Sequence, residues 1–211
     1  MKALSSLLLA VLLFTAVPSA AQDGGWVSLF DGTSLDGWQV GENASTFSVE
    51  DGVLVVHGPR AHLFYAGPVE NHDFDNFEFQ ADVMTTEGSN SGIYFHTEYQ
   101  ESGWPSKGFE VQVNNSHTDW KRTAGLYNIS DVREAPAVDD EWFTMRIRVE
   151  DKRIRTYVND SLVVDFTEPT PPEPPQGNAD RVISSGTFAL QGHDPDSRVY
   201  YRDIMVRPLP E

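Results

Sequence analysis

Hydrophobic and polar side chains alternate at every position of the stretch from Gly108 to Asn114. Successive side chains of a β-strand point to opposite faces of a sheet, so this alternation predicts a strand. The row that is expected to face a core consists of Phe109, Val111 and Val113. The opposite face of the same strand then carries Glu110, Gln112 and Asn114.

The same alternation recurs along the chain and predicts an all-β protein. It is unbroken over residues 77–83 and 142–149, and Asp51-Gly52 between two apolar runs indicates a hairpin at 47–56. Further strands are expected at 26–30, 63–65, 93–97, 154–158, 162–166, 187–191 and 199–206. We find no long helical periodicity and no internal repeat. We therefore predict a single antiparallel β-sandwich domain over residues 22–211, whose buried side chains include Phe77, Phe79, Phe109, Val111, Met145 and Ile147.

Several of the predicted strands carry polar or aromatic side chains on the face away from the core. The four sets are Glu78, Gln80 and Asp82; Tyr94 and His96; Glu110, Gln112 and Asn114; and Arg146 and Arg148. If their strands are neighbours, the sets form one polar floor. Such a floor suits a carbohydrate, because hydroxyls need hydrogen-bond partners and aromatic rings cover the C–H faces of a sugar. The alternative is cross-strand charge pairing, in which the two arginines bind acidic neighbours and only keep a sheet face soluble.

Residues 1–21 are predicted to be a signal peptide. A basic start at Lys2 precedes an apolar run over residues 4–17, and small residues at 19–21 favour cleavage before Gln22. The run is too short for a comfortable membrane span, and no later stretch approaches about 20 apolar residues. We therefore expect a secreted or periplasmic protein without a membrane span.

The amino-acid composition excludes several kinds of chemical site and disfavours several classes of binding partner. The chain has no cysteine, which excludes a lipid-anchored cysteine, disulfides, thiolate metal sites and a cysteine nucleophile. A formal charge of -17 at pH 7 makes nucleic acid and anionic membrane surfaces poor partners. The abundant aromatic residues, glycines and prolines are typical of short strands joined by many turns. Nothing in these features indicates an oligomeric state.

A series of motifs resembles, in order, those of the 3-keto-disaccharide hydrolase domain family, long catalogued as a domain of unknown function. The motifs are Leu29–Trp38, Val49–Leu54, Phe77–Phe79, Asn90–Phe95, Gly108–Val113, Glu141-Trp142, Asn159, Ala189–His193 and Tyr201–Ile204. The resemblance implies a concanavalin A-like jelly-roll sandwich of the lectin and glucanase type. It also implies action, outside the cytoplasm, on glycosides whose sugar is oxidised at carbon 3. Two segments depart from the family's pattern and bear on substrate range: Arg122–Tyr127 and the irregular residues 115–121.

The polar row of the 108–114 strand bears on the mechanism. A retaining glycosidase needs two carboxyl groups about 5–5.5 Å apart, whereas this row holds one acid, Glu110, and two amides. A ketone at carbon 3 opens another route, because it acidifies the hydrogen on carbon 2. A base can remove that hydrogen and expel the substituent on carbon 1, and water can then add to the unsaturated sugar. This route needs a base, a group that stabilises the enolate and a proton donor for the leaving oxygen.

The candidate catalytic residues are Glu110 and His96 as bases and His193 as an acid. The candidate substrate-binding residues are Asn90, Tyr94, Lys107, Gln112, Asn114, Tyr127 and Arg202. Each histidine is equally consistent with an ordinary structural role, and Arg202 faces the floor only if a β-bulge intervenes. A divalent metal on histidine and glutamate would also polarise the ketone, but no ligand spacing in the sequence indicates one.

Two functions remain open at this point. The first is an exported hydrolase or lyase that cleaves 3-keto-disaccharides or other 3-keto-glycosides. The second is a non-catalytic carbohydrate-binding module, which would use the same floor without needing a base. Release of a monosaccharide from a 3-keto-disaccharide distinguishes them.

Overall fold

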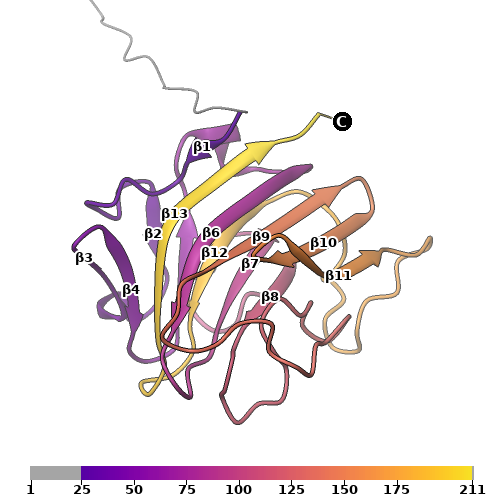
Figure 1. The fold of residues 1–211 in the computed structure, drawn as a ribbon. Coiled ribbons are helices and arrows are strands. Elements are labelled where there is room, and N and C mark those ends of the chain that lie inside the picture. Colours follow the sequence, from indigo (N-terminus) through magenta and orange to yellow (C-terminus); the bar gives the residue numbers. More distant parts are fainter. Residues whose placement is uncertain (1–24, 211) are drawn as a thin grey trace, which may run out of the picture.

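Two antiparallel β-sheets pack face to face in the computed structural model, which describes residues 25–210 (Figure 1). Sheet A has eight strands and sheet B has five. The expected signal peptide at 1–21 lies outside the described residues. Over residues 25–210 the only helical elements are the 3-10 turns η1 (Ala44–Thr46) and η2 (Val69–His72). No helix in that range is long and apolar enough to cross a membrane.

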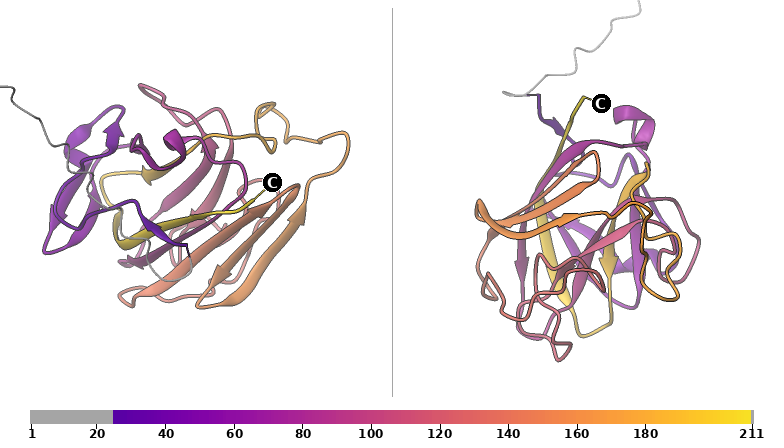
Figure 2. Two further views of the ribbon diagram at one scale, coloured as in Figure 1. Left: turned by 90° about the horizontal axis from the view of Figure 1, so that it is seen from above. Right: turned by 90° about the vertical axis from the view of Figure 1, so that its right-hand side faces the viewer.

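The strand order explains how distant parts of the chain meet. Sheet A runs β11 (Ser161–Thr167), β10 (Arg153–Val158), β9 (Phe143–Glu150), β6 (Phe77–Thr85), β13 (Arg198–Pro208), β4 (Val53–His57) and β3 (Phe47–Glu50), with β1 (Val27–Ser28) paired to β13. Sheet B runs β2 (Trp38–Val40), β5 (Ala61–Tyr65), β12 (Thr187–Gly192), β7 (Ser91–Thr97) and β8 (Phe109–Val113). Figure 2 shows the long connection between β11 and β12, in light orange, extending from one side of the strands.

The predicted strands are confirmed, with bounds that differ by a few residues. The 47–56 hairpin is also confirmed: Glu50 pairs with Val53, and both Asp51 and Gly52 have positive φ angles, as the tight turn requires. Strand β2 was not predicted, because three residues are too few to display an alternating pattern.

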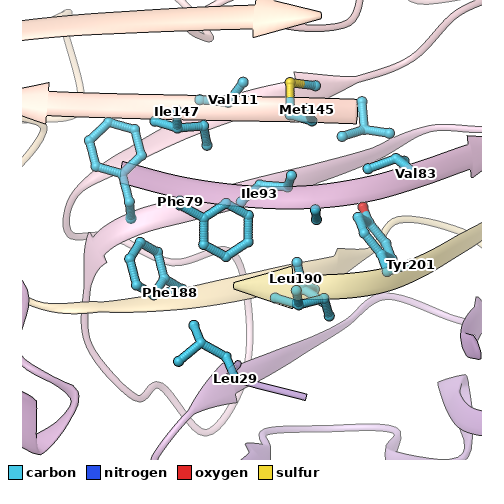
Figure 3. Packing of buried hydrophobic residues seen from close by; sticks show 14 of the residues in the cluster. Leu29, Phe79, Val83, Ile93, Val111, Met145, Ile147, Phe188, Leu190 and Tyr201 are labelled. Carbon is cyan, nitrogen blue, oxygen red and sulfur yellow. The ribbon is translucent and has the colours of Figure 1, made fainter. Parts of the chain in front are cut away.

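The core lies between the sheets and is built from the hydrophobic rows of both (Figure 3). Phe79 and Val83 come from β6 of sheet A, and Ile93 and Val111 come from β7 and β8 of sheet B. The six side chains predicted to be buried are each at most 1% exposed. The period-2 pattern thus identified the inward face of each of these strands correctly.

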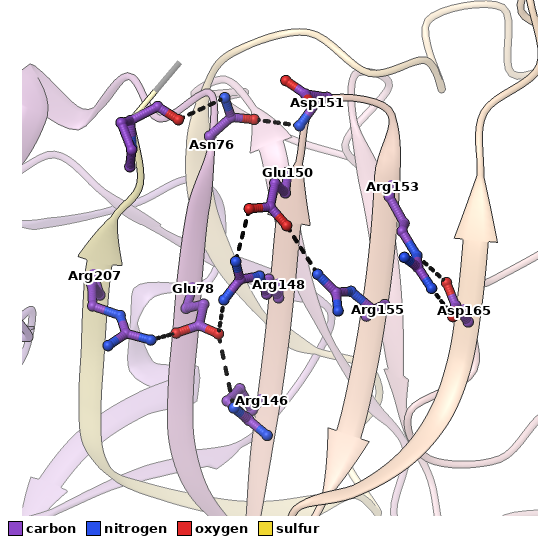
Figure 4. Close-up of polar contacts among 11 residues, drawn as sticks. Asn76, Glu78, Arg146, Arg148, Glu150, Asp151, Arg153, Arg155, Asp165 and Arg207 are labelled. Carbon is purple, nitrogen blue, oxygen red and sulfur yellow. Dashed lines mark hydrogen bonds and ion pairs between the residues drawn. The ribbon is translucent and has the colours of Figure 1, made fainter.

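The single polar floor expected from four sets of side chains is wrong. Strands β6 and β9 pair in sheet A, whereas β7 and β8 pair in sheet B, so the sets lie on two separate outer faces. On sheet A, Glu78 binds Arg148 at 2.9 Å, Arg146 at 3.8 Å and Arg207 (Figure 4). The alternative of cross-strand charge pairing therefore describes this face.

Candidate active site

The outer face of sheet B forms the floor of a pocket of about 230 Å³. Loops before β8, after β8 and before β12 supply its walls. Six of the ten site residues predicted from the sequence line it: Asn90, Tyr94, Glu110, Gln112, Tyr127 and His193. The other four lie elsewhere.

The Glu110 side chain lies over a glycine of the neighbouring strand. Glu110 pairs with Tyr94, and Gln112 pairs with Gly92. A Cβ atom at position 92 would lie 2.7 Å from Glu110 Oε1, so the carboxylate extends over the bare backbone of Gly92. A glycine inside a strand often marks a close approach of this kind.

Two donors hold the Glu110 carboxylate. Tyr94 Oη donates to Oε2 at 2.9 Å, and Gln191 Nε2 donates to Oε1 at 3.0 Å. Burial raises the pKa of Glu110, although these two hydrogen bonds and the charge of Arg181 act against that rise. Burial and the charge of Glu110 also raise the pKa of Tyr94, which keeps its hydroxyl protonated as a donor. Glu110 is therefore a fixed, desolvated carboxylate, which suits a general base.

Arg181 brings a buried positive charge to the same pocket. Its Nη1 donates to Tyr127 O at 2.9 Å, and its side chain is only 7% exposed. Over residues 25–210, Nε has no hydrogen-bond partner and no carboxylate pairs with the guanidinium. A buried charge without a direct ion-pair partner is unfavourable for folding, although the Glu110 carboxylate interacts with it electrostatically. This kind of cost is typical of functional sites.

His193 is oriented by the carboxylate that follows it. Its Nδ1 donates to Asp194 Oδ2 at 2.6 Å, because a carboxylate can only accept. Despite the desolvation of Asp194, the hydrogen bonds from His193 and Ser197 lower the pKa of this carboxyl group. The pair leaves Nε2 as the ring nitrogen that is available to a ligand in the pocket.

Two amides complete the floor. Gln112 Nε2 donates to Asn90 Oδ1 at 2.6 Å, and both side chains are 2% exposed. The Asn90 backbone N–H donates to Ser197 Oγ at 2.9 Å, which ties this amide pair to the Asp194 loop. The position after Glu110 on this face is therefore an amide that is already engaged, and it supplies no second carboxylate.

The chemical groups follow one another across the sheet. The strand order places Gln191 on β12, Tyr94 on β7 and Glu110 on β8. Tyr127 lies beyond β8, where its N–H donates to Glu110 O at 2.9 Å. Arg181 and Tyr127 thus lie on one side of the Glu110 carboxylate, and His193, which directly follows β12, lies on the other.

One cluster of side chains has the composition of a metal site. Ligand atoms of His117, His193 and Asp194 lie within 4.8 Å of one another. Asp194 already accepts four hydrogen bonds, from His193, the Ser197 hydroxyl and the N–H groups of Asp196 and Ser197. The Asp194 carboxylate is thus better suited to orienting His193 than to binding an ion.

His96 lies outside the pocket because of a β-bulge. Thr187 pairs with Thr97 but Ala189 pairs with Tyr94, so Phe188 opposes two residues of β7, and His96 has a φ of 53°. The ring packs against Phe77, its Nε2 donates to Asp75 O at 2.8 Å, and its Nδ1 accepts from Ser184 N at 3.4 Å. This position joins two loops and does not reach the ligand pocket.

Acid is expected to destabilise the fold through His96 and His62. Burial lowers the pKa of each to about 4 from 6.5, so the unfolded chain binds more protons between these pH values. Each neutral imidazole therefore contributes stability above pH 6.5 that is lost as the pH falls toward 4, about 3 kcal/mol apiece. Urea unfolding across this range measures the loss. In His96→Asn the dependence of the unfolding free energy on pH should be weaker, whereas an unchanged dependence would contradict this structural role of His96.

The remaining three predicted residues also have other surroundings. Lys107 lies 3.8 Å from Glu98 beside a separate hollow. Asn114 is buried, and its Nδ2 donates to Asp119 O and Lys121 O, so it shapes the loop after β8 that carries Asp119 in the pocket wall. The bulge considered for Arg202 is present, between Arg202 and Met205, but the side chain lies over Trp142 on the outer face of sheet A.

The structure adds residues that the sequence reasoning missed. Gln191, Trp104 and Arg181 line the pocket, and Asp194 orients His193. Gln191 and Asp194 border or belong to the Ala189–His193 motif, so their positions carried a usable signal. Trp104 and Arg181 lie in irregular loops, where no periodicity indicates which way a side chain points.

Sequence comparison finds a matching family and a curated relative. The family described as the 3-keto-alpha-glucoside-1,2-lyase-like domain matches residues 25–207. A curated protein named 3-keto-disaccharide hydrolase, from Bacteroides thetaiotaomicron, is 25% identical over 169 residues. The alignment covers 67% of this chain and 58% of that protein, so the chain spans less than two thirds of its relative's length.

Solved structures establish the fold. A Parabacteroides distasonis protein provisionally named a glycosyl hydrolase has a TM-score of 0.76 at 20% identity, covering 92% of this chain and 99% of that one. A Bacillus licheniformis β-glucanase has a TM-score of 0.57 at 10% identity, covering 90% and 100%. A carbohydrate-binding module from Bacillus subtilis has a TM-score of 0.56 at 13% identity, covering 81% and 95%. The predicted jelly-roll sandwich of the glucanase and lectin type is thereby confirmed.

Proposed function

Because the chain belongs to the 3-keto-alpha-glucoside-1,2-lyase-like domain family, we propose that it cleaves glycosides whose sugar carries a ketone at carbon 3. The family and the curated relative are both named for glycoside cleavage, which supports a carbohydrate-active function. The observation that carries the finer proposal is the position of Glu110, a buried carboxylate between a buried guanidinium on one side and a histidine–aspartate pair on the other.

This order of groups matches the order of the reacting atoms in the sugar. The ketone is on carbon 3, the acidic hydrogen is on carbon 2 and the leaving group is on carbon 1. A ring bound with carbon 2 at Glu110 would direct its ketone to Arg181 and Tyr127 and its glycosidic oxygen to His193. In this pose the base Glu110 would face carbon 2, the electrophile Arg181 would face the ketone on carbon 3, and the acid His193 would face the oxygen on carbon 1.

The proposed reaction is an elimination. Glu110 takes the proton from carbon 2, and the electrons of the C2–H bond form an enolate whose oxygen Arg181 stabilises. The enolate then expels the substituent on carbon 1. The C1–O bond breaks, and the leaving oxygen takes the Nε2 proton of a doubly protonated His193, whose Nδ1–H stays bonded to Asp194. A C1=C2 double bond forms and His193 is left as the neutral imidazole. Addition of water across that double bond gives the products of hydrolysis.

Double displacement at carbon 1 is a poorer match to the site. It would need a second carboxyl group about 5–5.5 Å from Glu110. The next residue on this face of β8 is Gln112, whose amide is bonded to Asn90. A non-catalytic binding module is the second candidate, and the fold shared with a carbohydrate-binding module favours it. That candidate gives no reason to bury an ionisable Glu110 beside an unpaired arginine.

The test is incubation with a 3-keto-disaccharide in D2O, with the unoxidised parent disaccharide as a control. We expect release of the leaving sugar and deuterium at carbon 2 of the keto product, above the exchange of the free 3-keto sugar alone. The parent sugar should remain intact, because nothing acidifies its C2 hydrogen. Cleavage without deuterium would indicate displacement, and binding without cleavage would establish the binding module.

We also propose that this reaction takes place outside the cytoplasm. Support comes from the basic start, apolar run and small-residue exit of residues 1–21.

A further inference from the structure

Trp104 is a large aromatic side chain that remains exposed at the edge of the pocket. It lies in the loop between β7 and β8, lines the pocket and is 45% exposed. Folding normally removes a tryptophan of this size from water, so a ring held at the mouth of a polar pocket calls for an explanation. Flat aromatic rings are suited to covering the C–H face of a sugar.

The surrounding loop fixes Trp104 in this place. Glu42 Oε1 accepts from Arg60 Nε at 2.9 Å and from the Gly103 N–H at 3.0 Å. Gln100 Nε2 donates to Trp104 O at 2.9 Å, and Arg60 lies over the indole, 5.4 Å from the ring centroid. The exposed ring is therefore preorganised, which reduces the entropy lost when a ligand packs against it.

Trp104 lies on the His193 side of Glu110. Its ring centroid is 5.5 Å from that of His193 and 5.6 Å from that of His62, which belongs to β5. Arg181 and Tyr127 lie beyond β8, on the opposite side of Glu110. In the proposed reaction His193 protonates the leaving oxygen, so Trp104 lies where the leaving group would extend.

The volume of the pocket also indicates that the leaving group would lie at the pocket edge, near Trp104. About 230 Å³ is below the range of about 300–1,000 Å³ that is usual for larger ligands, and it suits one sugar ring. The second ring of a disaccharide must then rest at the edge of the pocket, beyond the glycosidic oxygen.

We propose that Trp104 is the platform of a leaving-group subsite and makes the enzyme selective for glycosides whose leaving group is itself a sugar. This inference rests on the proposed function, because it takes the side of the leaving group from the role of His193. The chemistry that would recognise the ligand is stacking of a pyranose C–H face on the indole, with the Arg60 guanidinium beside it as a hydrogen-bond donor.

The test compares a 3-keto-disaccharide with the methyl glycoside of the same 3-keto sugar. Trp104→Ala should lower kcat/KM for the disaccharide about 10-fold, the scale of one aromatic contact, and should affect the methyl glycoside far less. Trp104→Phe, which keeps a ring, should lose less. Trp104→Leu supports the loop with apolar bulk but lacks the flat ring, so it should show the same selective loss even if the alanine variant does not fold.

Tyr99→Ala is the matched control. Tyr99 lies in the same loop between β7 and β8 and is 44% exposed, close to the value for Trp104, but it does not line the pocket, so its removal should leave both rates unchanged. If the unmutated protein cleaves neither substrate, the proposed function is wrong, and the proposed role of Trp104 is wrong as well. If it cleaves both and the Trp104 variants lose the two activities equally, or lose neither, only the platform is overturned.

Discussion

Replacing Glu110 by glutamine is expected to lower kcat on a 3-keto-disaccharide by about 10²–10⁴-fold, the usual contribution of a general base. Glutamine keeps the shape of the side chain but cannot accept the proton from carbon 2. Binding of the keto sugar should be largely preserved, because the floor and walls of the pocket remain.

The hydrogen-bond network can accommodate this change. Tyr94 can still donate to the new amide oxygen, as it does to Oε2 of Glu110. The new amide nitrogen would face Gln191 Nε2, which now donates to Oε1. The Gln191 Oε1 atom is buried without a partner within residues 25–210, so a 180° turn of that amide provides an acceptor. The turn gives up the 3.2 Å hydrogen bond from Gln191 Nε2 to Tyr94 Oη.

The same variant should be more stable than the unmutated protein at neutral pH. Burial raises the pKa of Glu110 above its ordinary value of 4.5, so the folded chain holds this proton more tightly than the unfolded chain. The ionised side chain therefore costs stability, and the cost grows as the pH rises from about 4.5 through the folded-state pKa. Glu110→Gln removes that cost, so its advantage in thermal melting should vanish at low pH.

Turnover and thermal melts, measured together, distinguish catalysis from folding. Loss of turnover with an unchanged or higher melting temperature at pH 7 supports Glu110 as the base. His96→Asn serves as the comparison, since His96 lies outside the pocket. A Glu110→Gln protein that turns over at nearly the normal rate would show that Glu110 is not the base and would pass that role to His193.

The alternation of side chains predicted the strands and the inward residues because it is a local property of each strand. Glu110 and Gln112 could be placed on one face for the same reason, and both line the pocket. The sheet to which a strand belongs is not local. Glu78 and Glu110 have equivalent patterns around them, yet one lies under three arginines of sheet A and the other lies in the pocket of sheet B.

The positions of two side chains, His96 and Asn114, were predicted wrongly because the regular alternation of strand side chains is interrupted at each of them. The bulge at His96 turns one residue of an alternating strand away from its expected face. Asn114 continues the alternation of β8 past the strand's last residue, Val113, where its side chain bonds to loop carbonyl groups. The side-chain directions of Trp104 and Arg181 could not be predicted, because both residues lie in loops whose backbone conformation is determined by tertiary contacts.

Arg181 provides the second large expected effect. Replacing it by methionine should lower kcat about 10²–10³-fold, as does the loss of one oxyanion donor in other enzymes. The variant should remain folded, because the buried guanidinium has no carboxylate partner within residues 25–210. The hydrogen bond to Tyr127 O is lost, but so is the cost of burying an unpaired charge.

The pH dependence separates this electrostatic role from a structural one. The positive charge of Arg181 lowers the pKa of Glu110, against the rise that burial causes. Without the arginine that pKa should increase further, so the acid limb of the kcat/KM profile should move to higher pH. Arg181→Lys keeps a point charge but loses the planar fork, so it should restore the acid limb more fully than the rate. A methionine variant with reduced turnover and an unmoved acid limb would show that Arg181 acts through the loop and not through its charge.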